Sequence, residues 1–216
     1  MTSEPPRSPP SPASDAGHYF DPAPTVASRP RRVPLVLPDV TLDLVTDAGV
    51  FAADRVDDGT KYLLLEGPTP PRGARHLLDL GAGYGPIAVT LARRSPDATV
   101  WAVEVNDRAR DLCRANAADT PNVVVASPAD VPAEIGFDGI WSNPPIRIGK
   151  PALHDLLRAS LDRLTPSGRA TLVVQKHLGA DSLARWLEGE GWPTRRLGSR
   201  QAYRLLDVGA RPLNNA

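Results

Sequence analysis

The sequence predicts an α/β protein built on one mostly parallel β-sheet, and three observations lead to this prediction. Short apolar runs typical of strands alternate with segments of helical periodicity through the centre of the chain. Two further strand-like runs, at 195–197 and 203–208, lie near the end of the chain with no helical pattern between them. The length of 216 residues is sufficient for one sizeable core. We therefore expect helices on both faces of the sheet and an antiparallel hairpin at its C-terminal end.

The N-terminal part of the chain is expected to differ from the rest. Residues 1–17 are rich in proline and serine, which predicts a disordered tail. Two short strands around a turn at Pro38-Asp39 are predicted by apolar residues in alternation: Val33, Leu35, Leu37, Val40, Leu42 and Leu44. The run Leu63–Leu65, after Asp57-Asp58-Gly59-Thr60, predicts a helix capped at its start. Residues 18–67 are thus expected to form an extension packed on a core domain of residues 68–216.

Within that core domain, strands and helices are predicted to alternate. The expected strands are His76–Leu80, Thr99–Val105, Val123–Val125, Ile140-Trp141, Ala170–Val174, Arg195–Leu197 and Tyr203–Val208. The expected helices are Ile87–Arg94, Arg108–Ala118, a segment with Leu153, Leu156, Leu157, Leu161 and Leu164 on one face, and a segment around Leu183, Trp186 and Leu187. Cys113, Trp141, Trp186 and Trp192 are expected in the interior. For the aromatic residues Tyr19, Phe20 and Phe51, packing contacts are favoured over stacking on a nucleic-acid base.

The composition limits the possible compartments and partners. The 25 basic and 25 acidic residues cancel, which argues against nucleic acid bound over a whole face but allows a local basic patch. The single cysteine cannot form an internal disulfide, and no cysteine–histidine cluster suggests a metal. No apolar run approaches the roughly 20 residues that span a bilayer, and the N-terminus lacks a signal peptide's apolar segment. A cytoplasmic protein without a membrane partner is expected, whereas its oligomeric state is not indicated.

A glycine-rich loop follows the first strand of the core domain, in the run Asp79-Leu80-Gly81-Ala82-Gly83-Tyr84-Gly85. Ligands of open α/β sheets bind at the carboxyl ends of strands, and glycines let a backbone approach a ligand closely. The glycine spacing differs from the G-x-G-x-x-G fingerprint of dinucleotide-binding proteins. Asp79 is expected to accept a hydrogen bond from a cationic amino group, such as that of S-adenosylmethionine. The loop residues Gly81, Ala82, Gly83, Tyr84 and Gly85 are expected to bind the same ligand. The alternative is a plain strand–helix turn.

Two later strand ends carry further candidates for a nucleoside site. Glu104 ends the second strand about 20 residues after the glycines, where a carboxylate can bind both ribose hydroxyls, and Val105 follows it. Ser127 and Asp130, after the third strand, are placed to border an adenine, although loop capping explains them equally well. Asn106 is expected to cap the next helix.

A second motif, Asn143-Pro144-Pro145-Ile146, directly follows the apolar strand around Trp141. The amino nitrogen of guanine or adenine is a poor nucleophile because its lone pair is delocalised into the ring. Two acceptors on its N–H groups favour the geometry needed to attack a sulfonium methyl, and the Asn143 side chain and the Pro144 carbonyl offer them. Pro145 restricts the backbone of Pro144 to an extended conformation. Catalysis would then rest on alignment and preorganised polar groups. The alternative is a proline-rich turn that only ends a strand.

Together the two motifs resemble the class I S-adenosylmethionine-dependent methyltransferases with an Asn-Pro-Pro signature. The resemblance is closer still to the small-domain guanine-N2 methyltransferases of small-subunit ribosomal RNA. It covers the chain from about residue 18 to its end. The matching runs include Asp58–Thr60, Leu63–Glu66, Gly83–Ile87, Val103–Asn106, Ser142–Lys150 and Gln175–Trp186. It implies a Rossmann-like, mostly parallel seven-stranded sheet, S-adenosylmethionine as cofactor, and ribosomal RNA or the small ribosomal subunit as partner.

The resemblance also implies roles for individual residues. Those expected to hold the cofactor are Asp79, Gly81, Gly83 and Glu104, with Gly59 and Thr60 at its methionine end; Asn143 and Pro144 orient the target amine, and Asn143 borders the cofactor too. The sequence departs from the family at Ile146, where many relatives carry an aromatic residue that stacks on the base. Longer relatives also carry an additional N-terminal domain for substrate recruitment.

Several basic residues are candidates for phosphate contacts, since Arg147, Lys150, Lys176 and His177 follow strand ends near the same crevice. Others are Arg195, Arg196, Arg200 and Arg204 in the terminal hairpin and Arg29, Arg31 and Arg32 near the N-terminus, and solvated surface charge explains all of them as well. Methylation of a protein glutamine amide is an alternative, because that nitrogen is also planar. A non-catalytic module that binds cofactor or RNA is another, whereas the glycine spacing disfavours an NAD oxidoreductase.

Overall fold

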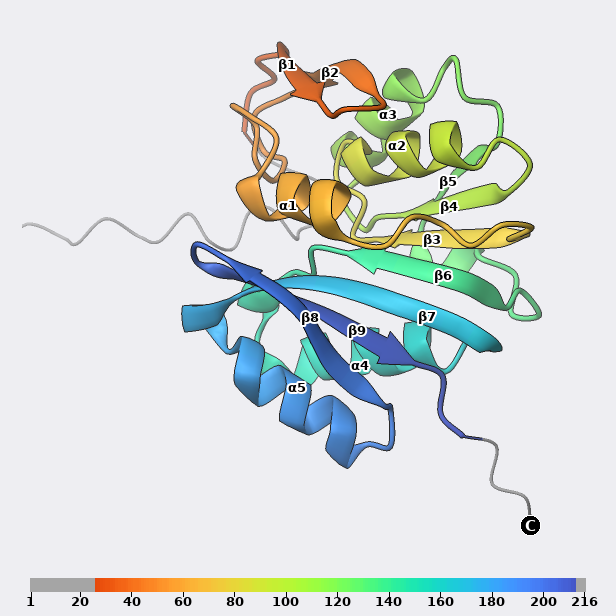
Figure 1. Cartoon of the computed structure of the whole chain (residues 1–216). Helices are drawn as coiled ribbons and strands as arrows, with labels where there is room; N and C mark the ends of the chain where they lie inside the picture. The colour runs from red at the N-terminus through yellow and green to blue at the C-terminus, as the bar shows by residue number, and fades with distance from the viewer. Residues whose placement is uncertain (1–25, 213–216) are drawn as a thin grey trace, which may run out of the picture.

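The computed structural model describes residues 26–212, which form two β-sheets and five α-helices within that range (Figure 1). The larger sheet contains β3 (His76–Leu80), β4 (Thr99–Val103), β5 (Val123–Ala126), β6 (Phe137–Ser142), β7 (Leu164–Gln175), β8 (Thr194–Arg200) and β9 (Tyr203–Gly209). Its strand order is β5-β4-β3-β6-β7-β9-β8. Strands β3 to β7 are parallel, and β9 pairs antiparallel with both β7 and β8. The predicted seven-stranded sheet with a C-terminal hairpin is confirmed.

Helices cover both faces of this sheet, as predicted. One face carries α1 (Asp58–Glu66), α2 (Pro86–Arg94) and α3 (Asp107–Asn116), and the other carries α4 (Lys150–Leu161) and α5 (Ala180–Gly189) (Figure 1). Neighbouring residues of a strand point to opposite faces, so Leu77 of β3 belongs to one hydrophobic cluster and Leu78 to the other. No helix within 26–212 is long and apolar enough to cross a membrane.

One boundary differs from the prediction. Leu164 was expected on the apolar face of the helix that begins at Lys150, but α4 ends at Leu161 and Leu164 begins β7. There it pairs with Phe137 of β6, and the register of the two strands shifts between Phe137 and Gly139. Leu164 matches the helical spacing of the preceding leucines only by chance. The predicted strand began at Ala170, whereas β7 begins six residues earlier, at Leu164.

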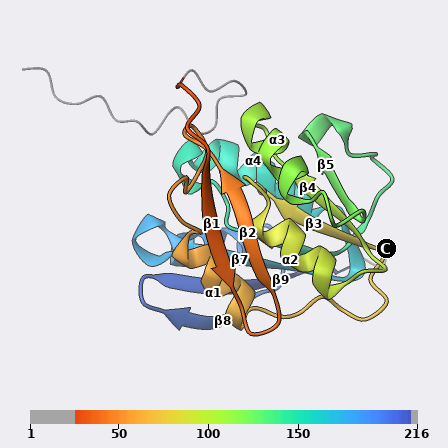
Figure 2. The same cartoon turned by 90° about the horizontal axis from the view of Figure 1, so that it is seen from above.

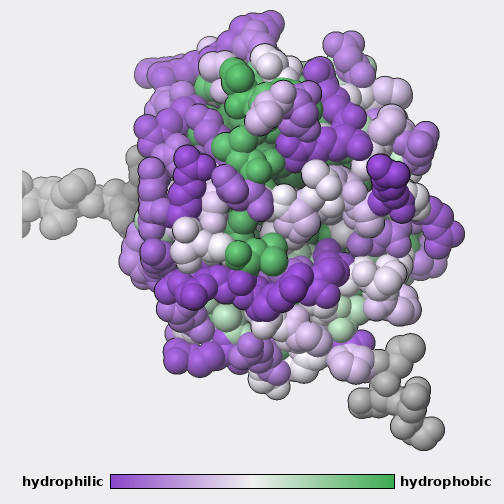
Figure 3. All heavy atoms as spheres, viewed as in Figure 1, coloured by the Kyte–Doolittle hydropathy of each residue, from purple (hydrophilic) through white to green (hydrophobic). Residues whose placement is uncertain are grey.

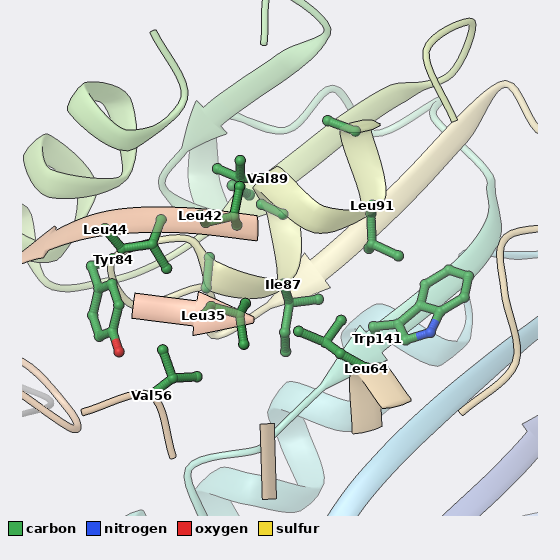
Figure 4. Packing of buried hydrophobic residues seen from close by; sticks show 14 of the residues in the cluster. Leu35, Leu42, Leu44, Val56, Leu64, Tyr84, Ile87, Val89, Leu91 and Trp141 are labelled. Carbon is green, nitrogen blue, oxygen red and sulfur yellow. The ribbon is translucent and has the colours of Figure 1, made fainter. Parts of the chain in front are cut away.

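The N-terminal extension forms the predicted hairpin. Strands β1 (Arg31–Val36) and β2 (Thr41–Thr46) pair antiparallel around Pro38-Asp39. The hairpin lies beside α2 (Figure 2). In Figure 4, Leu42 lies next to Val89 and Leu35 next to Ile87 of that helix, whereas Leu44 lies next to Tyr84 of the glycine loop. Extension and core therefore share one hydrophobic cluster.

The residues predicted to lie in the interior are buried or partly buried. Cys113, Trp141 and Trp192 are buried as expected, and Trp186 is partly buried. Burial also raises the pKa of the Cys113 thiol well above its usual range, so this cysteine remains protonated. Hydrophobic atoms gather in a band over the hairpin and α1 on the face seen in Figure 3. The predicted tail at 1–17, with Tyr19 and Phe20, lies outside the described residues.

The strand order determines where a ligand can bind. Strand β3 has β4 on one side and β6 on the other, so the chain reverses direction across the sheet between β3 and β6. A crevice opens at such a switch point, outside the carboxyl ends of the strands. The glycine loop follows β3 and the Asn-Pro-Pro turn follows β6, so both meet at this edge.

Candidate functional site

The two predicted motifs lie side by side at the carboxyl edge of the sheet. The Ser142 hydroxyl, at the end of β6, donates a 2.7 Å hydrogen bond to the carbonyl of Leu80 at the end of β3. Pro145 approaches the glycine loop so closely that a Cβ atom added at Gly81 would lie 3.8 Å from the Pro145 Cδ. The two loops therefore form adjacent walls of one site.

The glycine loop is held mainly by backbone hydrogen bonds. The amides of Gly81 and Ala82 both donate to the carbonyl of Val103 at the end of β4, at 2.9 and 3.0 Å. Gly81 and Gly83 have φ angles of 75° and 56°, which glycine adopts without strain. A Cβ added at Gly83 would meet no atom within 4 Å, so this position faces open space.

Gly85 has a packing role instead. Its φ is 93°, it caps the start of α2, and it does not line the cavity. A Cβ at this position would lie 2.6 Å from the Cys113 Sγ, so the close contact between the loop and α3 requires glycine. The prediction that Gly85 binds the cofactor stays untested, since the described contacts are internal.

The Glu104 carboxylate is the polar group that joins β4 to the glycine loop. One oxygen accepts the amide of Gly83 at 2.9 Å, and the other accepts the amides of Val105 and Asn106 at 2.7 and 2.9 Å. Each carboxylate oxygen has two lone pairs, so acceptor capacity remains on the oxygen facing Gly83. Asn106 caps α3 as predicted, its side-chain oxygen accepting the amide of Ala109.

Asp79 lies beneath the glycine loop and is not exposed at its surface. The residue is fully buried, and one carboxyl oxygen accepts the Ala88 amide at 2.8 Å, while the other has no hydrogen-bond partner among the described residues. The pKa of this carboxyl is raised to about 8, mainly by burial and also by the nearby charge of Glu104, while the hydrogen bond from Ala88 opposes the rise. Asp79 does not line the cavity, so its predicted contact with an amino group stays a prediction.

The Asn-Pro-Pro turn has a tight backbone geometry. Pro145 has φ −73° and ψ 71°, the values of an inverse γ-turn, and the Ile146 amide donates to the Pro144 carbonyl at 2.8 Å. One lone pair of that carbonyl is thus used within the turn, and the second remains for another donor. The short 3₁₀ turn η3 (Ile146–Ile148) follows.

The side chain of Asn143 is oriented by two residues of the N-terminal extension. Its amide nitrogen donates to the Asp57 carboxylate at 2.8 Å and to the Thr60 hydroxyl at 3.2 Å. The Asp57 and Thr60 oxygens both act as acceptors, so the Asn143 amide nitrogen points toward them and its amide oxygen points the other way. No described residue donates to that oxygen. Asn143 thus presents an acceptor that no described residue uses.

Asp57 is a site residue that the sequence did not identify as one. Its carboxylate caps α1 by accepting the amides of Gly59 and Thr60, in addition to the Asn143 amide. Asp57 also lines the cavity with Thr60. The capping pattern before Gly59 located the helix start, but nothing in the sequence indicated that the cap reaches Asn143.

The last strands contribute two further residues that were not predicted. The Gln175 amide donates to the Tyr203 hydroxyl at 3.0 Å, and this hydroxyl donates to Asp57 at 3.4 Å. Gln175 lines the cavity. Gly59, which was predicted to border the cofactor, packs against the Tyr203 ring: a Cβ added at Gly59 would lie 2.6 Å from the Tyr203 Cε1.

Loops and strand ends surround a cavity of about 390 Å³, within the range of roughly 300–1,000 Å³ typical of ligand pockets. The residues lining it include Val50, Phe51, Asp57, Thr60, Gly81, Ala82, Gly83, Tyr84, Glu104, Val105, Asn143, Pro144, Pro145, Ile146, Arg147 and Gln175. The predicted residues outside this lining are Gly59, Asp79, Gly85, Ser127, Asp130, Lys150 and Lys176. Ser127 and Asp130 instead form a capping box at the 3₁₀ turn η2 (Pro128–Asp130).

The predicted basic residues fall into two groups. Arg195, Arg200 and Arg204 form ion pairs with Asp207, Glu66 and Asp181, and Arg31 and Arg32 pair with Asp54 and Asp43. Arg147, Lys150 and Lys176 form no ion pair with any residue of 26–212, and the same holds for His177, Arg196 and Arg29. Arg147 lines the cavity, Lys150 begins α4, and Lys176 begins the exposed 3₁₀ turn η4 (Lys176–Leu178) that follows β7.

The model of the methyltransferase small domain family matches residues 41–206. The chain belongs to this family. It is 34% identical over 176 residues to the uncharacterized protein YbxB of Bacillus subtilis, covering 79% of this chain and 87% of that protein. It is 33% identical to the ribosomal RNA small subunit methyltransferase C of Hahella chejuensis, covering 76% of this chain and 48% of that enzyme.

A solved structure agrees with this membership of the methyltransferase small domain family. The T. thermophilus 16S rRNA N2 G1207 methyltransferase, in complex with AdoMet and guanosine, is similar with a TM-score of 0.71 and 26% identity. The match covers 87% of this chain and 52% of that one. The chain thus spans about half the length of both ribosomal RNA methyltransferases. Methyltransferases of this family use S-adenosylmethionine, so the predicted cofactor is confirmed.

The cavity fits this cofactor. It offers the Glu104 carboxylate for hydroxyl groups and apolar side chains such as Val105 for a ring. The Tyr84 hydroxyl is buried without a partner among the described residues, and burial raises its pKa well above the usual range, so it remains a proton donor. Within 26–212 no group of three or more His, Cys, Asp or Glu side chains is placed to hold a metal ion.

Proposed function

We propose that this chain transfers a methyl group from S-adenosylmethionine to the exocyclic N2 amine of a guanine in ribosomal RNA. The observation that carries the proposal is the orientation of Asn143. Asp57 and Thr60 hold its amide nitrogen, and its amide oxygen has no donor among the residues that the structure describes. The similarity to 16S rRNA N2 methyltransferases over most of this chain supports the choice of guanine.

The Asn143 oxygen and the second lone pair of the Pro144 carbonyl accept the two N–H groups of the target amine. These two hydrogen bonds draw the nitrogen lone pair out of conjugation and aim it along one line. S-adenosylmethionine, when bound, supplies the sulfonium methyl group. The nitrogen–carbon bond forms as the sulfur–carbon bond breaks, and the amine then gives its extra proton to solvent. Alignment and fixed dipoles provide the acceleration, so a strong general base is not needed.

The cofactor is held by the loops after β3 and β4. In this proposal Gly81, Ala82 and Gly83 supply backbone contacts, and Glu104 binds the ribose hydroxyls beside Val105. Asp79 acts from beneath the loop, whereas Ser127 and Asp130 shape the edge of the adenine region through their capping box. Residues 18–67 serve as an extension that completes the methyltransferase core of 68–216, since Asp57 and Thr60 belong to it.

RNA phosphates would be bound by Arg147, Lys150 and Lys176, which form no ion pair with any residue of 26–212. The partner is ribosomal RNA or the small ribosomal subunit, and the compartment is the cytoplasm. Methylation of a protein glutamine amide uses the same acceptor geometry and is therefore the competing function to test.

Labelled methyl transfer to separated fractions tests the proposal. Purified protein is incubated with methyl-labelled S-adenosylmethionine and with ribosomes, small subunits, naked rRNA or ribosomal proteins. We expect label in a guanine of small-subunit rRNA, and a loss of about 10²- to 10³-fold in the Asn143→Ala variant, whose affinity for the cofactor stays within about 3-fold of wild type by calorimetry.

Label in protein would establish the glutamine alternative. No transfer to any fraction, with cofactor still bound, would point to a non-catalytic binding module. Equal transfer by wild type and Asn143→Ala would contradict the proposed role of the turn.

A further inference from the structure

Phe51 is an aromatic side chain that lines the cavity and is not packed into the core. It is 48% exposed, although its neighbour Val50 and the nearby Val56 are each 1% exposed. The expectation that Phe51 serves in packing is thus wrong. Its segment is anchored by buried valines, while the phenyl ring faces the open side of the site.

The segment that carries Phe51 crosses the site from the cofactor side to the Asn-Pro-Pro turn. At one end the carbonyls of Ala48 and Gly49 accept from the side chains of Arg108 and Asn106, at 2.6 and 3.4 Å. Asn106 lies two residues after Glu104. At the other end Asp57 accepts from Asn143. Phe51 lies between these anchors, so its ring borders the space between the two walls.

The backbone around Phe51 has an unusual conformation. Gly49 has a φ of 82°, and Ala52, directly after Phe51, has a φ of 55°. A residue with a Cβ rarely adopts a positive φ, and such residues cluster at ligand-binding segments. Both Val50 and Phe51 line the cavity, but Val50 is buried in the core while Phe51 is half exposed.

The opposite wall lacks an aromatic residue. The position after Asn143-Pro144-Pro145 is Ile146, which lines the same cavity and is partly buried. Hydrogen bonds to the target amine fix only the edge of a base, whereas its faces need flat apolar contacts, which aromatic rings supply well. Phe51 and Ile146 are apolar side chains on two walls of one cavity that also contains Asn143.

We propose that Phe51 stacks on the target base and supplies, from the N-terminal extension, the grip that the Asn-Pro-Pro turn does not provide. This inference rests on the proposed function, because it requires a planar acceptor at Asn143. The ring lies against one face of the base, and Ile146 contacts the other face. Substrate affinity therefore depends on Phe51, whereas cofactor affinity does not.

Three variants at this position separate stacking from other roles. We measure kcat and KM for the RNA substrate, and cofactor affinity by calorimetry, for Phe51→Ala, Phe51→Leu and Phe51→Trp. Leu65→Ala is the matched control, since Leu65 is 42% exposed on α1 and does not line the cavity. Loss of one stacked base contact by alanine substitution lowers kcat/KM by roughly 5- to 150-fold. We expect that loss for Phe51→Ala, a partial loss for Phe51→Leu, and near-wild-type values for Phe51→Trp and Leu65→Ala.

The outcomes are distinct from those that test the function itself. If wild type is active, Asn143→Ala is inactive, and folded Phe51→Leu and Phe51→Ala match wild type, the stacking proposal is wrong and the function stands. A parallel weakening of cofactor affinity in Phe51→Ala would place the ring against the cofactor and would also overturn the proposal. Inactivity of the wild type on every RNA fraction would refute the proposed function first.

Discussion

The two loops that build the site are held in different ways. The glycine loop is fixed by its own backbone and by nearby residues, since Gly83 and Glu104 are 21 residues apart and Asp79 and Ala88 only nine. The Asn-Pro-Pro turn depends on side chains from a remote segment, because Asn143 is 86 residues from Asp57 and 83 from Thr60. The cofactor wall is thus a local structure, whereas in the acceptor wall the direction of the Asn143 amide depends on residues of the extension packed on the core.

This difference predicts how each wall responds to substitution. Changes in the glycine loop should act through packing and backbone conformation, and so through stability. Changes around Asn143 should act through the direction of one amide group, and so through the rate of methyl transfer with little effect on folding. Phe51, which lies on the same remote segment as Asp57, extends the acceptor wall.

The largest effect is expected at Gly85. Alanine there combines a φ of 93° with a Cβ 2.6 Å from the Cys113 Sγ, and overpacking costs about 1–3 kcal/mol while a left-handed residue costs about 1–2 kcal/mol. We expect Gly85→Ala to lower the free energy of unfolding by about 2–5 kcal/mol in urea denaturation.

The cause can be verified with Cys113→Ala, which removes the atom that the new Cβ would meet. The double variant should lose at least about 1 kcal/mol less than the sum of the two single variants. Additive losses would mean that the contact between the loop and α3 does not explain the need for glycine.

A smaller effect, on the rate alone, is expected at Asp57. Serine keeps the helix cap but is too short to hold the Asn143 amide nitrogen, so Asp57→Ser should lower kcat by about 10- to 100-fold. Asparagine retains an oxygen at the same position, so Asp57→Asn should keep most of the activity.

Steady-state rates and circular dichroism melts of both variants are the measurement. A strong loss in Asp57→Asn, equal to that in Asp57→Ser, would show that the negative charge matters and not the hydrogen bond to Asn143.

The smallest effect concerns Asp79 and pH. Its pKa is about 8 in the folded chain, against about 3.9 for an ordinary aspartate, so the folded state binds this proton more tightly than the unfolded state. Wild-type stability should therefore fall as pH rises between these values, and Asp79→Asn should lack that slope. One pH unit is worth about 1.4 kcal/mol, or roughly 3–6 °C in melting temperature for a chain of this size.

The difference in melting temperature between Asp79→Asn and wild type should thus grow by about 3–6 °C from pH 6 to pH 7. Thermal melts in matched buffers measure it. A constant difference would show that Asp79 is ionised in the folded protein, as a direct partner of a cationic amino group would require.

Much of the fold could be predicted because apolar periodicity depends on neighbouring residues. The strands His76–Leu80 and Tyr203–Val208 and the hairpin around Pro38 follow from such patterns. Leu164 was misplaced because helical spacing continued by chance into β7. The residue at which a strand begins or ends depends on its pairing with other strands, and a local sequence pattern carries no information about that pairing.

The same distinction separates the predicted site residues from the missed ones. Gly81, Gly83 and Asn143 lie in motifs and were found, whereas Asp57, Gln175 and Tyr203 reach the site only through the three-dimensional fold. Phe51 was misjudged for a related reason, because an aromatic residue between valines resembles core until its exposure is known. Cofactor sites built on one loop are therefore easier to predict than acceptor sites assembled from several segments.

If Asp57 acts on methyl transfer only through the Asn143 amide, the two substitutions must be coupled. A double-mutant cycle tests this coupling, with kcat measured for wild type, Asp57→Ser, Asn143→Ala and the double variant on the same RNA. We expect Asp57→Ser to cause no further loss, within about 2-fold, once Asn143 is alanine. Multiplication of the two single losses in the double variant would contradict it.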